Sequence, residues 1–246
     1  MQFHQGLARN PGRLYRHQII KQLVISNSRG ESKLIVDMGC GTGELLSYLA
    51  RDIGTQKLLG LDISKVGILK AQEKFPNLNF GLIEINKFEL HSRSIQSRAG
   101  IIICSEVLEH LEKPELMLKF ISNNLAPSGT LIVTVPGGPM SFLEEYIGHH
   151  RHYTKESLTD LLEDSGFEHI KIQRAGFPGI NLIRLVSILR GSQILNDISE
   201  SQKDSILLKF GFRIAEFILK RSLMDSKFGW QLIAVGHQME PTNLDA

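Results

Sequence analysis

The chain has 246 residues, of which 42% are hydrophobic and 22% are charged, and its formal net charge is +2. This length and apolar content suffice for one α/β domain with a sizeable core, and the near balance of charges excludes a general electrostatic attraction to nucleic acid. The cysteines Cys40 and Cys104 stand in no metal-binding spacing and favour a reducing, cytoplasmic compartment. The polar N-terminus argues against a signal peptide, and no apolar run is long enough to span a membrane.

Apolar runs rich in β-branched residues alternate with helical patterns along residues 34–175, behind an N-terminal helical segment at 1–33. Strands are expected at 34–36, 58–61, 80–83, 101–103 and 131–135, and helices at 44–51, 65–74, 114–125 and 155–164. Ser64 and Thr154 are the expected N-caps of two of these helices. Continuous apolar strands are buried on both faces of a sheet. The alternation therefore predicts a doubly wound, Rossmann-like, mostly parallel seven-stranded sheet.

The chain changes character after residue 175. Residues 180–190 and 206–223 read as apolar helices studded with Arg and Lys, and a final strand is expected within 229–238. We therefore predict a single domain over 1–246, with the core at 34–175 and a helical insertion at 176–228 before the last strand. Three explanations of the apolar helices stay open: they cover the sheet and roof the pocket, form a homodimer contact, or lie on a membrane surface.

A glycine loop, Asp37-Met38-Gly39-Cys40-Gly41-Thr42-Gly43, leaves the first strand and enters a helix. Glycines allow close approach of the backbone to a ligand, and a helix N-terminus offers unpaired N–H groups. Asp62 ends the next strand about 20 residues on, the spacing of a ribose-binding acid. The pattern G-x-G-x-G departs from the dinucleotide fingerprint, and Asp37 would repel a pyrophosphate but attract an ammonium or a sulfonium. A nicotinamide site and an ordinary turn with packing glycines are the alternatives.

This segment resembles motif I of the class I S-adenosylmethionine-dependent methyltransferases, and the likeness runs from about residue 34 to 138. The resemblance implies S-adenosylmethionine as the cofactor. It places the methionyl part at the glycine loop, the ribose at the end of the second strand, the adenine near the end of the third, and the methyl-transfer pocket at the end of the fourth. The implied cofactor-binding residues are Asp37, Gly39, Cys40, Gly41, Asp62, Ile63, Glu84, Ile85, Ser105 and Glu106.

A second motif, E-x-x-E-H, follows the strand at 101–103. On a helical turn Glu106, Glu109 and His110 would share one face, and such a set suits Mg²⁺ or Mn²⁺. The motif resembles two metal-dependent branches of the family, the ubiquinone-biosynthesis O-methyltransferases and the small-RNA 2′-O-methyltransferases. The second branch adds a later histidine, which corresponds to His149, so the implied metal ligands are Glu106, Glu109, His110 and His149. Alternatively no metal binds, Glu106 faces the pocket, and His149 or His152 serves as general base.

The sequence therefore predicts an S-adenosylmethionine-dependent methyltransferase that O-methylates a small-molecule, glycan or lipid-linked acceptor, with His149, His152 and Glu106 as catalytic candidates. The chain shows no cluster of Lys and Arg with interleaved aromatic residues, which argues against nucleic acid as a partner. Two alternatives stay open: an RNA 2′-O-methyltransferase with a divalent metal, and a non-catalytic regulatory protein that binds the cofactor.

Overall fold

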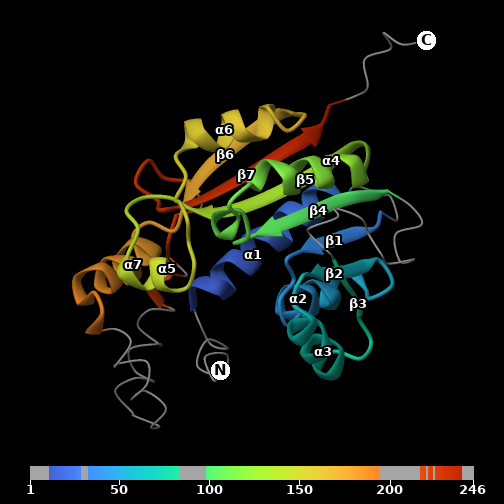
Figure 1. Cartoon of the computed structure of the whole chain (residues 1–246), viewed down its shortest axis with the longest axis horizontal. Helices are drawn as coiled ribbons and strands as arrows, with labels where there is room; N and C mark the ends of the chain where they lie inside the picture. The colour runs from blue at the N-terminus through green and yellow to red at the C-terminus, as the bar shows by residue number, and fades with distance from the viewer. Residues whose placement is uncertain are drawn as a thin grey trace.

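The computed structural model describes residues 11–28, 33–83, 98–193, 217–219, 221–223 and 225–239. The predicted α/β fold is confirmed (Figure 1). The elements in chain order are α1 (Pro11–Asn27), β1 (Ile35–Met38), α2 (Glu44–Ile53), β2 (Leu58–Asp62), α3 (Lys65–Lys74), β3 (Asn79–Leu82), β4 (Ala99–Ser105), the 3₁₀ helix η2 (Leu108–His110), α4 (Pro114–Asn124), β5 (Leu125–Pro136), α5 (Phe142–Tyr146), α6 (Lys155–Glu163), β6 (Phe167–Ala175), α7 (Gly179–Arg190) and β7 (Gln231–Gln238).

The described strands form one seven-stranded sheet in the order β3-β2-β1-β4-β5-β7-β6. The pairs from β3 to β5 are parallel, whereas β7 runs antiparallel to both β5 and β6. In the central parallel strands the carboxyl ends therefore meet at one edge, where loops from different strands come together.

Helices cover both faces of the sheet, as the alternation of buried side chains along its strands requires. Val36 and Met38 of β1 pack into a core with residues of α4 and α6. Ile35 faces the opposite side and packs into a second core with residues of α1 and α2. Figure 1 shows the same layers, with α4 and α6 above the sheet and α1, α2 and α3 below it. Since Asp37 shares the parity of Ile35, its side chain points to the α1 and α2 side.

Most predicted elements agree with the structure to within one or two residues, and both predicted caps are present. The side chain of Ser64 accepts the N–H of Gly67, and that of Thr154 accepts the N–H of Ser157. The strand β6 was missing from the prediction. Only its end residues, Phe167 and Ala175, are buried, and it is paired on one side only, with β7, so it lacks the apolar run that marks the central strands.

The predicted helical insertion is confirmed where the structure describes it, in α7 and in residues 217–219. The expected helix over 206–223 does not reach its predicted end, because Leu223 forms an isolated β-bridge with Phe177. Most of that segment, like residues 1–10 of the expected N-terminal helical segment, lies outside the described residues.

Helix α7 has one face against the domain and one face toward solvent. Ile180 is buried together with Tyr15 and Ile19 of α1, whereas Val186 is 54% and Leu189 77% exposed. The buried face supports the explanation that the insertion covers the sheet, and the exposed face leaves a dimer or membrane contact as proposals. No helix in the described part of the chain is long and apolar enough to cross a membrane.

Tyr15 joins α1 to both ends of the insertion, and we expect its hydroxyl to contribute to stability. The hydroxyl donates to the carbonyl of Leu223 at 2.9 Å and accepts the N–H of Gly176 at 3.1 Å. Tyr15→Phe should lower the free energy of unfolding by about 1–2 kcal/mol, because both bonds lie within a buried cluster. Urea denaturation measures this change. Tyr146→Phe is the control, since Tyr146 is 57% exposed and its replacement should cost less than about 0.5 kcal/mol.

Candidate active site

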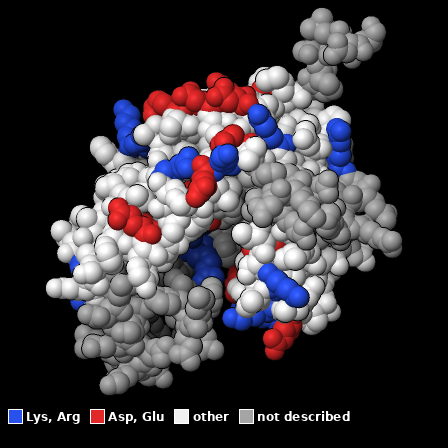
Figure 2. Space-filling model, in the orientation of Figure 1, with Lys and Arg blue, Asp and Glu red and all other residues white. Residues whose placement is uncertain are grey.

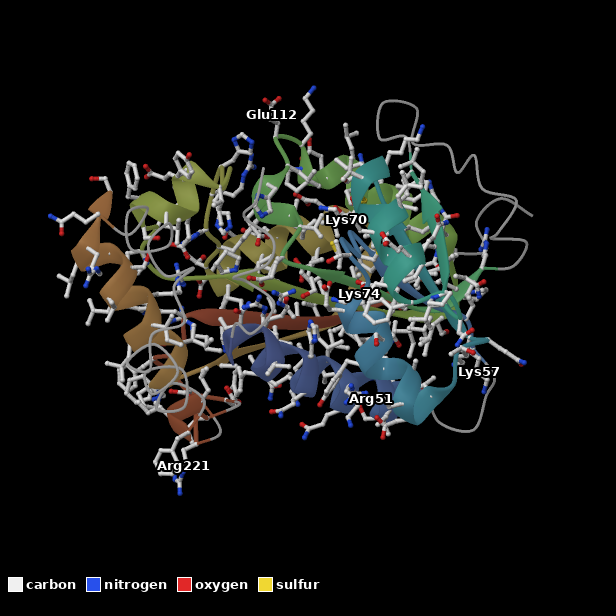
Figure 3. The ribbon with its side chains drawn as sticks, turned by 90° about the horizontal axis from the view of Figure 1, so that it is seen from below. Arg51, Lys57, Lys70, Lys74, Glu112 and Arg221 are labelled. Atoms are coloured by element: carbon white, nitrogen blue, oxygen red, sulfur yellow. The ribbon has the colours of Figure 1, made fainter. Side chains whose placement is uncertain are left out.

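A pocket of about 350 Å³ opens at the carboxyl edge of the sheet, between the glycine loop, α1 and the start of α3. Figure 2 shows a hollow in the lower half of the molecule with Lys and Arg side chains inside it. In Figure 3, Lys70 and Lys74 lie on α3 and Arg51 lies on α2. The pocket is lined by Arg13, Arg16, His17, Asp37, Gly39, Cys40, Gly41, Thr42, Glu44, Leu45, Ser64, Val66, Gly67, Lys70, Ser105 and Glu106.

Glycine is required at two positions of the loop, for different reasons. Gly39 has φ 81°, and a Cβ built on it would lie 2.4 Å from a methyl group of Val107. Gly41 has φ 55°, and a Cβ there would meet nothing within 4 Å. Positive φ values of this kind favour glycine. Gly39 therefore lets the loop pack on Val107, while Gly41 brings bare backbone to the pocket.

The loop amides are less available to a ligand than the sequence suggested. The N–H groups of Gly39 and Cys40 both donate to the carbonyl of Leu61, at 2.7 and 3.0 Å. The N–H of Gly41 donates to the carboxylate of Asp62 at 2.7 Å, and that of Gly43 donates to the carbonyl of Cys40 at 2.9 Å. These four N–H groups are used within the protein and fix the shape of the loop. A ligand would therefore contact the surface of the loop and the buried carboxylate of Asp37.

Asp62 is confirmed at the end of β2, but neither it nor Ile63 is among the residues that line the pocket. One carboxylate oxygen accepts the N–H of Gly41, and the other accepts the N–H of Ser64 at 2.8 Å. Ile63 is 57% exposed. Each carboxylate oxygen has a second lone pair, so the ribose-binding role of Asp62 stays a prediction. Glu84 and Ile85, the expected adenine contacts, lie outside the described residues.

Asp37 is the buried carboxylate of the pocket, with only 3% of its surface exposed. Burial, and then the nearby carboxylate of Asp62, raise its pKa from 3.8 to about 7. A cationic ligand group beside Asp37 would favour the charged form of this acid. Cys40 also lines the pocket, and burial raises the pKa of its thiol, so it acts as an apolar wall and not as a nucleophile.

Helix α1 contributes cationic and imidazole groups that the sequence reasoning missed. Arg13, Arg16 and His17 line the pocket. Arg13 pairs with Glu44 at 3.9 Å, and burial lowers the pKa of His17 to about 4. Their i, i+3, i+4 spacing places them on one helical face, which was the available signal. Nothing in the sequence indicated that this face lies over a glycine loop more than 20 residues later.

Glu106 follows β4 with φ 56° and is held by side chains from two other strands. Its Oε1 accepts from the hydroxyl of Thr134 at 3.1 Å and from Nε2 of Gln231 at 2.9 Å. Its Oε2 lies 3.7 Å from Nη1 of Arg16. Ser105 also lines the pocket, and its hydroxyl lies 2.8 Å from that of Thr134. Both residues therefore lie where the sequence placed them.

The four predicted metal ligands do not come together as one set. Glu109, His110 and His149 have candidate ligand atoms within 4.8 Å of one another, and Glu106 belongs to neither such group found in the described part of the chain. The helical turn expected to align Glu106 with Glu109 is wrong, because only residues 108–110 form a 3₁₀ turn and Glu106 precedes it with a positive φ. Glu106 therefore stands outside the 3₁₀ turn that carries Glu109 and His110.

Glu109 is 0% exposed, and neither of its carboxylate oxygens has a hydrogen-bond partner. Burial, and then the charge of Glu106, raise its pKa well above the usual range. Unpartnered buried carboxylates are rare, because burying a polar group without a hydrogen bond is costly. The site around Glu109 thus favours either a protonated acid or a bound cation.

His149 and His152 lie together on the loop between α5 and α6. Nδ1 of His149 lies 3.3 Å from Nε2 of His152, and Nδ1 of His152 lies 3.0 Å from the carbonyl of Gly138. Burial lowers the pKa of His149 to about 4 and also lowers that of His152. Both imidazoles are therefore neutral at pH 7 and can accept a proton or a hydrogen bond.

Arg184 of α7 ties the insertion to this histidine loop, and sequence reasoning gave it no role. Its guanidinium donates to the carbonyls of Gly137, Trp230 and Pro139, and it pairs with Glu144 at 2.8 Å. The nearby group of Glu144, His149 and His152 also has metal-ligand spacing. The guanidinium beside Glu144 disfavours a cation there.

Comparisons with known proteins agree with this architecture. A family model described as a methyltransferase domain matches residues 12–172. A mitochondrial ubiquinone biosynthesis O-methyltransferase of Dictyostelium discoideum is 25% identical over 125 residues, which are 46% of this chain and 39% of that protein. A probable S-adenosylmethionine-dependent methyltransferase of Mycolicibacterium smegmatis is 23% identical over 209 residues, which are 81% of this chain and 76% of that protein.

Among solved structures, a SAM-dependent methyltransferase from Archaeoglobus fulgidus aligns with a TM-score of 0.55 at 18% identity, over 90% of this chain and 94% of that one. At this level of identity the likeness shows the fold. Together, the sheet order, the glycine loop and the matched family define a class I S-adenosylmethionine-dependent methyltransferase. The chain belongs to the methyltransferase domain family.

The raised pKa of Asp37 predicts that cofactor affinity depends on pH. A cationic ligand binds the ionised acid better, so the affinity for S-adenosylmethionine should rise by about tenfold from pH 6 to pH 8. Calorimetry in matched buffers measures this, and Asp37→Asn should bind more weakly, with an affinity that depends less on pH.

In the ligand-free protein the raised pKa of Asp37 also acts on folding, and the free energy of unfolding should fall as pH rises from 3.8 to about 7. If the affinity of the native protein for S-adenosylmethionine depends on pH no more than that of Asp37→Asn, the role of Asp37 in binding the cofactor is refuted.

Proposed function

We propose that this chain transfers the methyl group of S-adenosylmethionine to an oxygen of a small-molecule, glycan or lipid-linked acceptor. The observation that carries the proposal is the pocket in which the glycine loop, the buried Asp37 and the carboxylate of Glu106 meet. Anionic groups at its base suit a donor with a sulfonium and an ammonium, and Arg13 and Arg16 suit its carboxylate.

The acceptor side of the site supports an oxygen nucleophile. His110 and His149 have ring centroids 4.6 Å apart, and His149 also contacts His152. Where no metal is bound, a neutral imidazole accepts a hydrogen bond from the acceptor hydroxyl and orients its lone pairs toward the methyl group. Methyl transfer is an in-line displacement, so most of the acceleration would come from holding the donor and the acceptor in line.

We also propose that Glu109, His110 and His149 bind a divalent cation, either Mg²⁺ or Mn²⁺. Nδ1 of His110 lies 3.1 Å from the carbonyl of Gly148, which can only accept, so its Nε2 keeps a lone pair. His149, whose Nδ1 lies 3.3 Å from Nε2 of His152, adds a second imidazole to this group. The Nε2 lone pair of His110 and the imidazole of His149, beside the unpartnered carboxylate of Glu109, fit a cation, which would lower the pKa of an acceptor hydroxyl.

Manganese binding tests this site without an acceptor. The chelator-treated protein should bind one Mn²⁺ per chain in an electron paramagnetic resonance titration. Glu109→Gln and His149→Ala should weaken the binding by about tenfold or more, because each removes a ligand. His150→Ala is the matched control, since His150 is exposed on the same loop and belongs to neither ligand group. Unchanged binding in Glu109→Gln, or none in the native protein, would refute the metal site.

Transfer of labelled methyl groups tests the function as a whole. The protein and S-adenosylmethionine with a labelled methyl group are incubated with the small-molecule, lipid and RNA fractions of a cell extract. Label should enter the small-molecule or lipid fraction, and His149→Ala should lower the rate by about a hundredfold. Label in the RNA fraction alone would contradict the proposed acceptor class. Tight cofactor binding without transfer to any fraction would favour a non-catalytic regulatory protein that binds the cofactor.

A further inference from the structure

The carboxylate of Glu106 is fixed by a hydrogen-bond network that crosses three strands. The hydroxyl of Thr134, on β5, donates to Oε1, and that of Ser105, on β4, lies 2.8 Å from the Thr134 hydroxyl. Since Thr134 has only one hydroxyl proton, Ser105 must donate to Thr134. Gln231, on β7, uses both protons of its Nε2, one for Oε1 of Glu106 and one for the carbonyl of Val135 at 3.0 Å.

The donors of this network are buried, whereas the carboxylate reaches the pocket. Thr134 is 0% and Gln231 2% exposed, and the side chain of Glu106 is 25% exposed and lines the pocket. Glu106 adopts φ 56°, a region that residues other than glycine seldom occupy unless their surroundings enforce it. Oε1 is thus bound on the protein side, and Oε2 lies on the side of Arg16 and the pocket.

We infer that Gln231 and Thr134 are positioning residues that hold the Glu106 carboxylate against the donor pocket, where it makes the site prefer the sulfonium donor over its neutral demethylated product. This inference rests on the proposed function. S-adenosylmethionine and S-adenosylhomocysteine differ by one methyl group and one positive charge at sulfur. A fixed carboxylate near that sulfur attracts the first and not the second.

Because of this attraction, Glu106 acts in binding of the donor and in release of the demethylated product. The positive charge at sulfur disappears as the methyl group leaves, so the product loses the interaction that held the donor. Arg16, 3.7 Å from Oε2, opposes the attraction because its charge has the same sign as the sulfonium. Glu106 and Arg16 should therefore shift the donor-to-product preference in opposite directions.

Calorimetric titration of the full chain with each of the two ligands tests the inference without an acceptor. The quantity measured is the Kd of S-adenosylhomocysteine divided by the Kd of S-adenosylmethionine. Glu106→Gln should lower this ratio on the order of tenfold, and Arg16→Met should raise it. Equal changes in both affinities in Glu106→Gln would overturn the inference and leave the proposed function standing. If the native protein binds neither ligand, the proposed function itself fails.

The positioning role is tested by a double-mutant cycle. Thr134→Val and Gln231→Met should each lower the ratio by about threefold in the native background and leave it unchanged in the Glu106→Gln background. Thr134→Ser keeps the hydroxyl and should keep the native ratio. A purely structural role would instead weaken both ligands alike in both backgrounds, which would refute the assignment.

Gln238→Met is the matched control for Gln231→Met. Gln238 also lies on β7, but its amide donates to the carbonyl of Ser122, away from Glu106. This variant should retain the native ratio. If Gln238→Met lowers the ratio of the two Kd values as much as Gln231→Met does, the effect is a general one of changes in β7, and this would count against the inference.

Discussion

The geometry of the pocket depends on one carboxylate that accepts two backbone N–H groups from two different turns. Asp62 binds Gly41 at 2.7 Å and Ser64 at 2.8 Å, and so joins the loop after β1 to the turn after β2. Charge-assisted hydrogen bonds of this kind are stronger than neutral ones. Because the Gly39 and Cys40 amides also bind the end of β2, the loop cannot move without that strand. A role in shaping the loop therefore accompanies any contact of Asp62 with ribose.

The charges around the pocket are arranged in opposing pairs. Arg13 faces Glu44, and Arg16 faces Glu106, while Asp37 lies buried in the wall of the pocket. A zwitterionic donor with an added sulfonium charge can exchange partners with each pair without leaving a buried charge uncompensated. This arrangement explains why a helix from the start of the domain, α1, belongs to the site as much as the glycine loop does.

The proposed acceptor side is built by segments that are distant in sequence. The loop with His149 and His152 is linked through Arg184 to α7, and α7 packs through Ile180 on the first half of α1. The insertion thus supports the histidines from behind while it exposes Val186 and Leu189. A change in α7 would reach the histidines through Arg184, which contacts His152 and the carbonyls around it.

The sequence by itself determined the layered fold, the glycine loop and the place of Asp62, because strand and helix periodicity, glycine spacing and strand ends are local signals. It missed β6, whose position at the edge of the sheet removes the apolar signal. The tertiary structure alone decided that Arg16 lies over the pocket, that Gln231 reaches Glu106 across 125 residues of chain, and that Glu106 separates from Glu109. These outcomes depend on sheet order and on one positive φ value, which are set by packing between distant segments.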